Sequence, residues 1–382
     1  MSRAAARGID AVAGALASFS DGPPLNLLVG TPRFDPPEVL LESLRRAADE
    51  PHFGYTSNQG TLEVREAIAA LHASRGETVA PEAVFVTHGA KPAVLALMGT
   101  LTGPGDEIVL PSPCYPPYLT IPPLFGARVV TVPRVGPSFD FDVDAIQDAI
   151  TERTRAVVIA SPCNPTGAVL SPDALRTLRG RCRESGIRLI LDEAYEAFHF
   201  GKAPEPLDGI DDVACHVRSV SKSYALCGWR TGYVLAAPEL VQRLTWFQAA
   251  NLNPPNALMQ GALEAMPRVP ESYAREVRDR VRSQHDAVAE ALAGTPIQGR
   301  RPAGGFYQLV DLRPAMEATG FATALELCQA LASREGVALW PGEDYLAEGW
   351  ARISVASLEH PEQAAELRTR ILRFLEHTRA RS

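Results

Sequence analysis

The sequence contains no CxxC pair, no long apolar run and no excess of basic residues. Its six cysteines are scattered along 382 residues, and a chain of this length does not need disulfide bonds for stability. No apolar run approaches the ~18 residues that a transmembrane helix requires. The formal net charge of −8 gives no basic patch that would attract nucleic acid. We therefore expect no membrane or nucleic-acid partner and no metal.

The first residues also lack a continuous hydrophobic segment, because Asp10 interrupts the apolar stretch over 1–19. This pattern is typical of an amphipathic surface helix rather than a signal peptide. Together with cysteines that are expected to be reduced, it predicts a cytoplasmic protein. There are no internal repeats or low-complexity segments, and the composition, with 46% hydrophobic and 21% charged residues, is typical of a globular chain.

What does recur is a short apolar, β-branched run followed by a turn and a helical pattern. Runs that are apolar on both faces are typical of a mostly parallel sheet covered by helices. Ser171 and Pro172 supply an N-cap and a first turn for one such helix, over 172–185. The expected strands are 83–87, 107–110, 128–132, 156–160, 187–191, 215–220 and 231–236. The pattern predicts an α/β sheet domain.

The pattern changes after about residue 275. A long charged helix is expected over 271–293, a last helix over 361–378, and strands over 304–312, 336–342 and 351–356. Two or three strands with helices on one face describe a smaller α+β lobe, and the chain exceeds the ~250–300 residues at which a single core stops growing. We expect a large α/β domain over 36–275 and a small α+β domain built from 1–35 and 276–382.

Ligands of open α/β sheets bind beyond the carboxyl ends of the strands, so the residues just after each strand are the candidates. Five such segments are expected to converge on one site. They are Gly89-Ala90-Lys91, Pro111 to Tyr118, Asn164, Asp192 to Tyr195, and Ser219 to Arg230. In the last of them, SVSKSYALCGWRTGY, Lys222 follows a strand directly among small hydroxyl residues, and Arg230 stands eight residues on.

This segment resembles the active-site lysine motif of the class I/II aminotransferases, which are fold type I pyridoxal-phosphate-dependent enzymes. The resemblance extends from Gly30 to Arg352, with the family's motifs in order and at similar spacing. It implies the fold type I architecture, in which the large, PLP-binding domain contains a mostly parallel seven-stranded sheet. It also implies pyridoxal 5′-phosphate as the cofactor, held as a Schiff base on Lys222.

Pyridoxal chemistry needs an amine, a partner for the ring nitrogen and donors for the phenolic oxygen. By resemblance, Lys222 supplies the amine and shuttles a proton during catalysis. Asp192 matches the aspartate that keeps the ring nitrogen protonated, since an opposite charge at close range favours the charged form. Tyr195 and Asn164 match the donors to the phenolic oxygen, and the bond between Asn164 and Pro165 is expected to be cis. Lys222, Asp192 and Tyr195 are thus the expected catalytic residues.

A phosphate requires backbone amides at a helix N-terminus. Gly89, Ala90 and Lys91, between an expected strand and helix, provide that geometry. By resemblance, Ser219 and Arg230 complete the phosphate site, and Arg230 adds a charge-assisted pair.

The resemblance also implies stacking, substrate-binding and trans-acting residues. Tyr115 falls where the family stacks an aromatic ring on the pyridine. Arg352 matches the arginine that binds the substrate α-carboxylate, for which its planar fork is suited. Gly30 matches the loop whose backbone touches the same carboxylate, and Asn164 is counted with the substrate-binding residues. Tyr55 matches a tyrosine that reaches the phosphate of the neighbouring subunit, which implies a homodimer with shared active sites.

Three segments depart from the family pattern and bear on the substrate. Arg33 stands where many relatives have an aspartate, and it either binds a side-chain carboxylate or is a solvated loop arginine. The segment 342–349 replaces a small-residue and aromatic loop that often closes over substrate. The segment 251–256 is unusually polar and proline-rich.

The resemblance therefore implies an aminotransferase of amino acid metabolism, which moves an amino group between an α-amino acid and a 2-oxo acid. Two alternatives stay open. The same cofactor site supports lyase, decarboxylase, cyclase and carbon–carbon bond-forming synthase reactions, so a specialised biosynthetic enzyme is the first. The second is a non-catalytic pyridoxal-binding regulator with an added DNA-binding module, for which we expect no room before Gly30.

Overall fold

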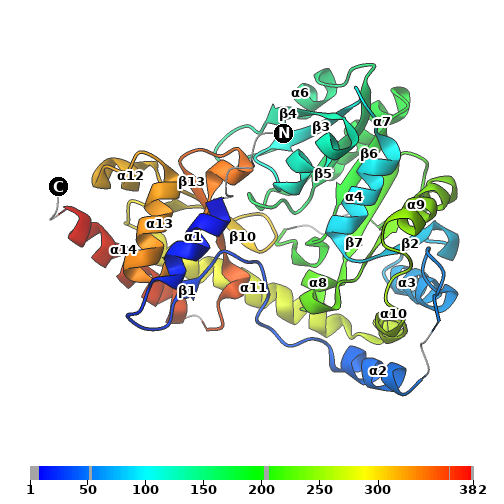
Figure 1. Ribbon diagram of the computed structural model, residues 1–382, viewed down its shortest axis with the longest axis horizontal. Helices are drawn as coiled ribbons and strands as arrows, with labels where there is room; N and C mark the ends of the chain where they lie inside the picture. The colour runs from blue at the N-terminus through cyan, green and yellow to red at the C-terminus, as the bar shows by residue number, and fades with distance from the viewer. Residues whose placement is uncertain (1–7, 51–53, 202–205, 361, 380–382) are drawn as a thin grey trace.

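In the computed structural model the chain forms two groups of elements, which lie at opposite ends of Figure 1. The structure describes residues 8–50, 54–201, 206–360 and 362–379. Its larger group is built on a sheet of strands β2 (Val84–Thr87), β3 (Glu107–Ser112), β4 (Arg128–Pro133), β5 (Thr154–Ala160), β6 (Arg188–Asp192), β7 (Ala214–Ser219) and β8 (Gly232–Leu235).

The strand order of this sheet is β2-β8-β7-β6-β5-β3-β4. Neighbouring strands from β7 to β4 run parallel, whereas β8 is antiparallel to both β7 and β2. The expectation of a mostly parallel seven-stranded sheet is therefore confirmed. Each expected strand lies within two residues of an observed one at either end.

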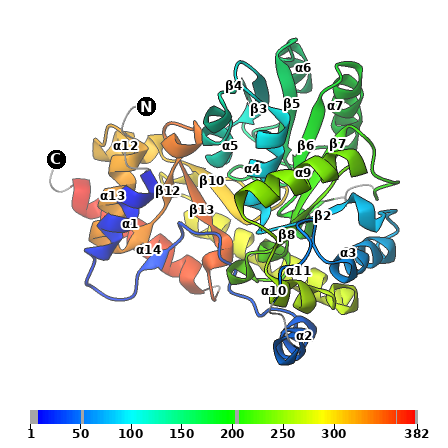
Figure 2. The ribbon, with the colours of Figure 1, turned by 45° about the vertical axis from the view of Figure 1, so that its right-hand side comes forward.

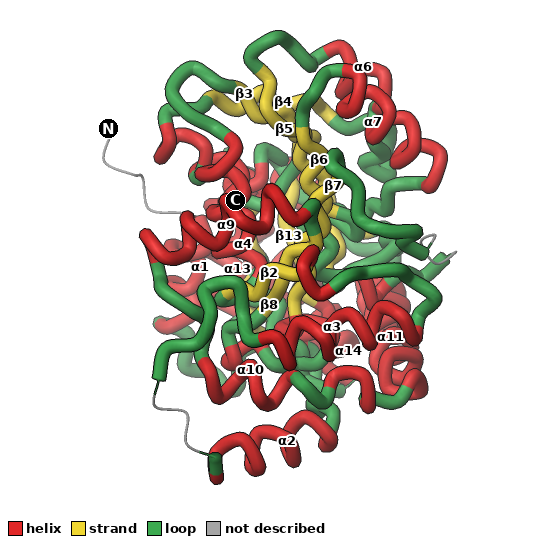
Figure 3. The backbone as a smooth tube through the Cα atoms, turned by 90° about the vertical axis from the view of Figure 1, so that its right-hand side faces the viewer, coloured by secondary structure: helices red, strands yellow, loops and turns green. Residues whose placement is uncertain are grey.

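Both faces of the sheet are buried, which explains the unbroken apolar runs in the sequence. Ile108 and Val158 point into one hydrophobic cluster, whereas their neighbours Val109 and Val157 point into another. Helices α4 (Ala90–Leu101) and α9 (Pro238–Asn251) supply residues to the first cluster, and α6 (Val143–Asp148) and α7 (Pro172–Glu184) supply residues to the second. In Figure 3 the strands accordingly run between two layers of helices.

The smaller group contains an antiparallel sheet of β9 (Gln298–Gly299), β10 (Tyr307–Asp311), β12 (Trp340–Pro341) and β13 (Trp350–Ser354). Strand β1 (Leu25–Asn26) pairs with β11 (Val337–Ala338), so an N-terminal segment packs on C-terminal elements as expected. The single strand expected over 336–342 is instead divided, because β11 and β12 pair with different partners. Figure 2 shows this group together with α1 (Gly8–Ala17), α12 (Arg313–Thr319), α13 (Ala324–Glu335) and α14 (Glu362–Arg379).

The remaining helices are α2 (Glu38–Asp49), α3 (Leu62–Ser74), α5 (Pro117–Thr120), α8 (Val220–Ser223), α10 (Ala257–Leu263) and α11 (Glu271–Leu292). Helix α11 runs without a break across residue 275, and its apolar side contributes Val277 and Val281 to the core of the smaller group. The boundary between the two expected domains at residue 275 stays a prediction. Among the described residues, no helix is long and apolar enough to cross a membrane.

Candidate active site

A cavity of about 390 Å³ lies beyond the carboxyl ends of the central parallel strands, and both groups of elements contribute to its wall. Most of the residues that the sequence singled out line it. These are Gly30, Ala90, Lys91, Tyr115, Asn164, Asp192, Tyr195, Ser219, Lys222, Arg230 and Arg352. The expected convergence of the post-strand loops is therefore found, while the chemical role of each residue stays a prediction.

Lys222 lies on the short helix α8, which begins directly after β7. The Oγ of Ser219 caps this helix by accepting a hydrogen bond from the backbone N–H of Ser221 at 3.2 Å. The Nζ of Lys222 donates to the carbonyl oxygen of Gly30 at 2.5 Å and lies 3.7 Å from the Sγ of Cys227. The amine is thus held inside the cavity by a backbone contact to the N-terminal loop.

Asp192 is a buried carboxylate at the end of β6. It accepts hydrogen bonds from the hydroxyl of Tyr118 at 2.6 Å and from the backbone N–H of Ala194 at 3.0 Å. Burial raises the pKa of this carboxyl, although both hydrogen bonds oppose the shift. Among the described residues, no cationic side chain lies within ion-pair distance of it. A buried carboxylate in this state is suited to a cation that a ligand brings, such as a protonated ring nitrogen.

Gly89 and Arg230 meet at the N-terminus of α4. Gly89 has a φ of 101°, a conformation that favours glycine, and a Cβ on it would lie 2.8 Å from the Nη2 of Arg230. The guanidinium of Arg230 donates to the carbonyl oxygens of Cys227 at 3.1 Å and His88 at 3.4 Å. A helix N-terminus, a serine hydroxyl from Ser219 and this arginine together fit a phosphate group.

Arg352, on β13, is fully buried against three aromatic rings. Its guanidinium carbon lies 3.9 Å from the ring centroid of Tyr307, 4.3 Å from that of Trp340 and 5.3 Å from that of Tyr345. Its Nη1 donates to the Oδ1 of Asn164 at 2.9 Å.

The second terminal nitrogen of Arg352 donates to the carbonyl oxygen of Leu28, whereas its Nε has no hydrogen-bond partner among the described residues. A buried guanidinium with neutral partners and an unused N–H group is suited to a carboxylate. The peptide bond between Asn164 and Pro165 is cis, as the resemblance implied.

Tyr195 and Tyr307 form a buried pair of hydroxyl groups at the cavity wall. Their oxygens lie 2.8 Å apart, and either hydroxyl can be the donor. Burial raises the pKa of Tyr195 well above its ordinary value. Burial likewise raises the pKa of Tyr115 to about 12, and its ring packs edge-on against Tyr118 with centroids 5.6 Å apart. The phenols of Tyr195 and Tyr115 are therefore neutral donors at physiological pH.

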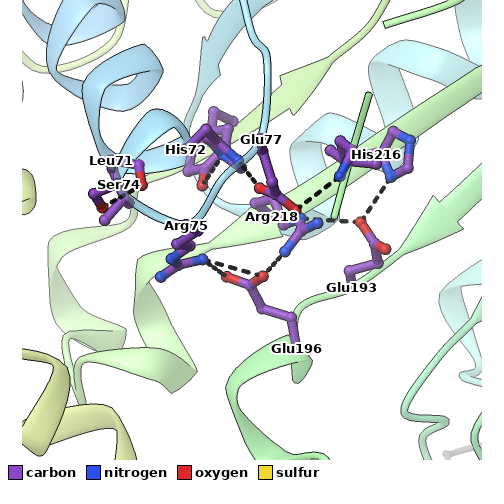
Figure 4. A network of polar contacts seen from close by, with 11 residues as sticks. Leu71, His72, Ser74, Arg75, Glu77, Glu193, Glu196, His216 and Arg218 are labelled. Atoms are coloured by element: carbon purple, nitrogen blue, oxygen red, sulfur yellow. Dashed lines mark hydrogen bonds and ion pairs between the residues drawn. The ribbon is translucent and has the colours of Figure 1, made fainter. Parts of the chain in front are cut away.

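An ion-pair network lies behind the cavity, and Figure 4 shows its residues. Arg218 contacts Glu193, with Nε 2.9 Å from Oε2, and also pairs with Glu196. Glu193 accepts from the Nδ1 of His216 at 2.9 Å, and Glu196 pairs with Arg75 at 3.2 Å. Burial opposes ionisation of Glu193, but Arg218 and His216 outweigh it and lower the pKa of Glu193 to about 2.

Two residues of this network are adjacent in the sequence to two residues that line the cavity. Glu193 follows Asp192, and Arg218 precedes Ser219, while successive side chains on a strand point to opposite faces. The network on one face therefore fixes the ends of β6 and β7, and so holds Asp192 and Ser219 in place on the other.

Other residues that the sequence singled out do not line the cavity. Tyr55 is 90% exposed and lies beside residues 254–258 in a surface groove. Arg33 is an exposed loop arginine whose Nε lies 3.7 Å from the Oε1 of Glu359. In the segment 342–349, Asp344 accepts hydrogen bonds from the first backbone N–H groups of α1 and from the indole of Trp340.

Tyr307, Trp340 and Tyr118 also line the cavity, but the sequence does not single them out as individual site residues. Tyr118 stands at the end of an expected post-strand segment, and Tyr307 and Trp340 lie within expected strands. The position of Tyr307 and Trp340 in the cavity depends on pairing between β10, β12 and β13, which a local sequence pattern does not reveal. Tyr118 reaches the cavity from the short helix α5.

The chain is similar in sequence to known aminotransferases. A model of the family "Aminotransferase class I and II" matches residues 23–371. The aspartate/prephenate aminotransferase of Thermus thermophilus is 33% identical over 355 residues, which cover 91% of this chain and 90% of that protein. A probable aspartate/prephenate aminotransferase of Aquifex aeolicus is 33% identical over 358 residues, with 91% and 90% coverage.

Solved structures agree with these sequence relatives. The aspartate aminotransferase of Thermus thermophilus with maleate superposes with a TM-score of 0.87 at 30% identity, covering 96% of each chain. The aromatic aminotransferase of Pyrococcus horikoshii OT3 has a TM-score of 0.85 at 30% identity, covering 96% of this chain and 99% of that one.

Proposed function

Since the chain belongs to the class I and II aminotransferases, we propose that the cavity around Lys222 is where it transfers the amino group. The enzyme moves an amino group between an α-amino acid and a 2-oxo acid, and its cofactor is pyridoxal 5′-phosphate. The observation that carries the assignment of the site is the placement of Lys222, Asp192 and Arg352 around one cavity.

Bound pyridoxal phosphate supplies an aldehyde that couples to amines and a ring that withdraws electrons from the substrate. Lys222 would hold the cofactor through its amine, and the free amine would carry the proton removed from the substrate Cα. Asp192 provides the negative charge that keeps the ring nitrogen protonated. Tyr195 and Asn164 donate to the phenolic oxygen, and Ser219, Arg230 and the first amides of α4 bind the phosphate.

Arg352 binds the α-carboxylate of the substrate in this proposal. Its Nε is free of partners among the described residues, and its two neutral oxygen partners, on Asn164 and Leu28, are weaker acceptors than a carboxylate. Arg352 and Lys222 line the same cavity, so a substrate whose carboxylate is bound by Arg352 would share that cavity with the amine of Lys222.

The substrate range is proposed from the wall of the cavity and from the relatives. Two relatives are named for aspartate and prephenate, one an acidic and one a ring-bearing compound. The cavity here combines the aromatic residues Tyr115 and Trp340 with the apolar side chains of Val29 and Val94. We propose donors with an acidic or aromatic side chain. A screen of amino donors against 2-oxo acids, with product identification, tests this range.

We also propose a cytoplasmic homodimer in which Tyr55 reaches the partner's cavity. Tyr55 is 90% exposed, and Trp246 and Leu252, at the C-terminal end of α9, are 65% and 47% exposed. These exposed side chains are the candidates for the contact between the two subunits. Sedimentation of the purified protein tests the dimer, and a monomer at working concentration contradicts it.

We further propose two domains. The large domain covers residues 36–275, and the small domain is built from residues 1–35 and 276–382.

A further inference from the structure

Tyr307, on β10, is in contact with residues that carry three different proposed roles. It is buried, with 3% of its surface exposed. A Cβ on Gly30 would lie 2.0 Å from its hydroxyl oxygen, so the N-terminal loop passes directly over that hydroxyl. The same Gly30 accepts the hydrogen bond from Lys222. Tyr307 therefore lies where the loop that holds the lysine, the substrate arginine and the phenol of Tyr195 come together.

The hydroxyl of Tyr307 faces Tyr195. Their oxygens are 2.8 Å apart, in a pair of residues 112 positions apart in the sequence. Tyr195 has one hydroxyl hydrogen, which its proposed role directs to the phenolic oxygen of the cofactor. In that arrangement Tyr307 must be the donor to Tyr195. A donated hydrogen bond polarises the accepting hydroxyl and makes it a stronger donor in turn.

The ring of Tyr307 faces Arg352. The guanidinium carbon lies 3.9 Å from its centroid, the shortest of the three ring contacts to this arginine. A desolvated cation over an aromatic face is held by the ring quadrupole, which fixes both the position and the plane of the guanidinium. One side chain thus contacts the carboxylate-binding arginine with its face and the cofactor-facing tyrosine with its hydroxyl.

We propose that Tyr307 is a positioning residue that links substrate recognition to the cofactor. Its ring orients Arg352 toward the α-carboxylate, and its hydroxyl strengthens Tyr195 as a donor to the phenolic oxygen. This inference rests on the proposed function of the cavity. The ring and the hydroxyl of Tyr307 have different proposed roles, so two substitutions at this position have different expected effects.

Tyr307→Phe removes the hydroxyl and keeps the ring. A weaker donor at Tyr195 stabilises a negative phenolic oxygen less, so the pH midpoint of the cofactor's visible absorbance change should rise. The expected shift is up to about one pH unit, the size of one hydrogen bond. Tyr195→Phe should raise the midpoint further, and adding Tyr307→Phe to it should produce no further change, because the hydroxyl acts through Tyr195.

Tyr307→Leu removes the ring as well. Because Arg352 then loses its nearest aromatic contact, the KM for the amino donor should rise about 5- to 10-fold, whereas Tyr307→Phe should leave it near the wild-type value. The matched control is Tyr345→Phe. Tyr345 also faces Arg352, and its buried hydroxyl has no partner among the described residues, so the pH midpoint should not move.

Absorbance titration and thermal melting of each variant decide the question. If the pH midpoint of the absorbance change does not move in a folded Tyr307→Phe protein, the inference is wrong but the proposed function stands. The same holds if Tyr307→Phe produces its full shift again in the double variant. A wild-type protein that binds the cofactor without forming its lysine-linked absorbance band contradicts the proposed function of the site, and the inference with it.

Discussion

The hydroxyl of Tyr118 lies 2.6 Å from Oδ2 of Asp192, and it is the side-chain donor to a carboxylate that has no cationic partner among the described residues. Burial, together with the neighbouring charge of Glu193, raises the pKa of Asp192, while the two hydrogen bonds from Tyr118 and Ala194 favour its charged form. In the proposed function, this buried carboxylate pairs with the positive charge of the cofactor's ring nitrogen.

Asp192→Asn should lower kcat by about 100-fold or more, because a close opposite charge is worth about two pKa units to the ring nitrogen. Tyr118→Phe should lower it by about 10-fold or less, the effect of one lost hydrogen bond. Steady-state kinetics of both variants measure the difference. Asp173→Asn, which removes an exposed carboxylate on α7, is the control, and wild-type turnover in Asp192→Asn would contradict the assignment.

Arg218→Leu should destabilise the fold strongly. The substitution leaves Glu193 buried without its main cationic partner, and breaking a buried pair in this way costs about 3–5 kcal/mol. Arg301→Leu removes an exposed partner of Asp286 and should cost less than about 1 kcal/mol. Urea unfolding of the two variants compares their free energies of unfolding. Equal losses would contradict the prediction that the buried network stabilises the fold.

Acid should destabilise the protein through its buried histidines. Burial lowers the pKa of His285 to about 4, and it also lowers the pKa values of His72 and His199. Each folded-state pKa lies below the unfolded value of about 6.5, so below that pH the unfolded chain takes up protons that the folded chain does not. Stability should be full above about pH 6.5 and decline as the pH falls toward 5.

His285→Gln removes the largest of these shifts and should make the decline of Tm with falling pH shallower. Its Nε2 donates to the carbonyl oxygen of Gly305, a bond that a glutamine amide can replace. Melting curves of both proteins between about pH 7 and pH 5 measure the effect. Parallel curves would mean that His285 does not titrate on unfolding.

Arg352→Lys should lower kcat/KM, by an amount that corresponds to a loss of about 1–3 kcal/mol of transition-state stabilisation. The charge is kept, but the planar fork and its stacking on Tyr307 are lost. Full kinetics with one amino donor measure the loss. A variant with unchanged kcat/KM would place the carboxylate elsewhere in the cavity.

The sequence predicted the sheet and most of the cavity for different physical reasons. Strands such as 156–160 are apolar on both faces because both faces are buried, a property that is visible in a local run. Lys222, Asp192 and Asn164 follow strands whose carboxyl ends converge, so their proximity could be expected from topology. The pairing of Tyr195 with Tyr307 brings together residues 112 positions apart through packing of the two groups of elements, which no local pattern contains.

Tyr55, unlike the cavity residues, lies outside the cavity of its own chain. Its proposed role depends on a second copy of the chain, and in a single chain its side chain is exposed. At the departures from the family pattern, Arg33 pairs with Glu359 at the surface, Asp344 caps α1, and Tyr345 faces Arg352.

The most direct test of the central claim is the position of the covalent link to the cofactor. The chain contains three lysines, Lys91, Lys202 and Lys222, so peptide mapping after borohydride reduction assigns the link without ambiguity. We predict that the mass of the reduced cofactor is found on the peptide that contains Lys222 and on no other, and that Lys222→Ala carries none. A label on Lys91 or Lys202, or an unlabelled Lys222 in cofactor-loaded protein, would contradict the account.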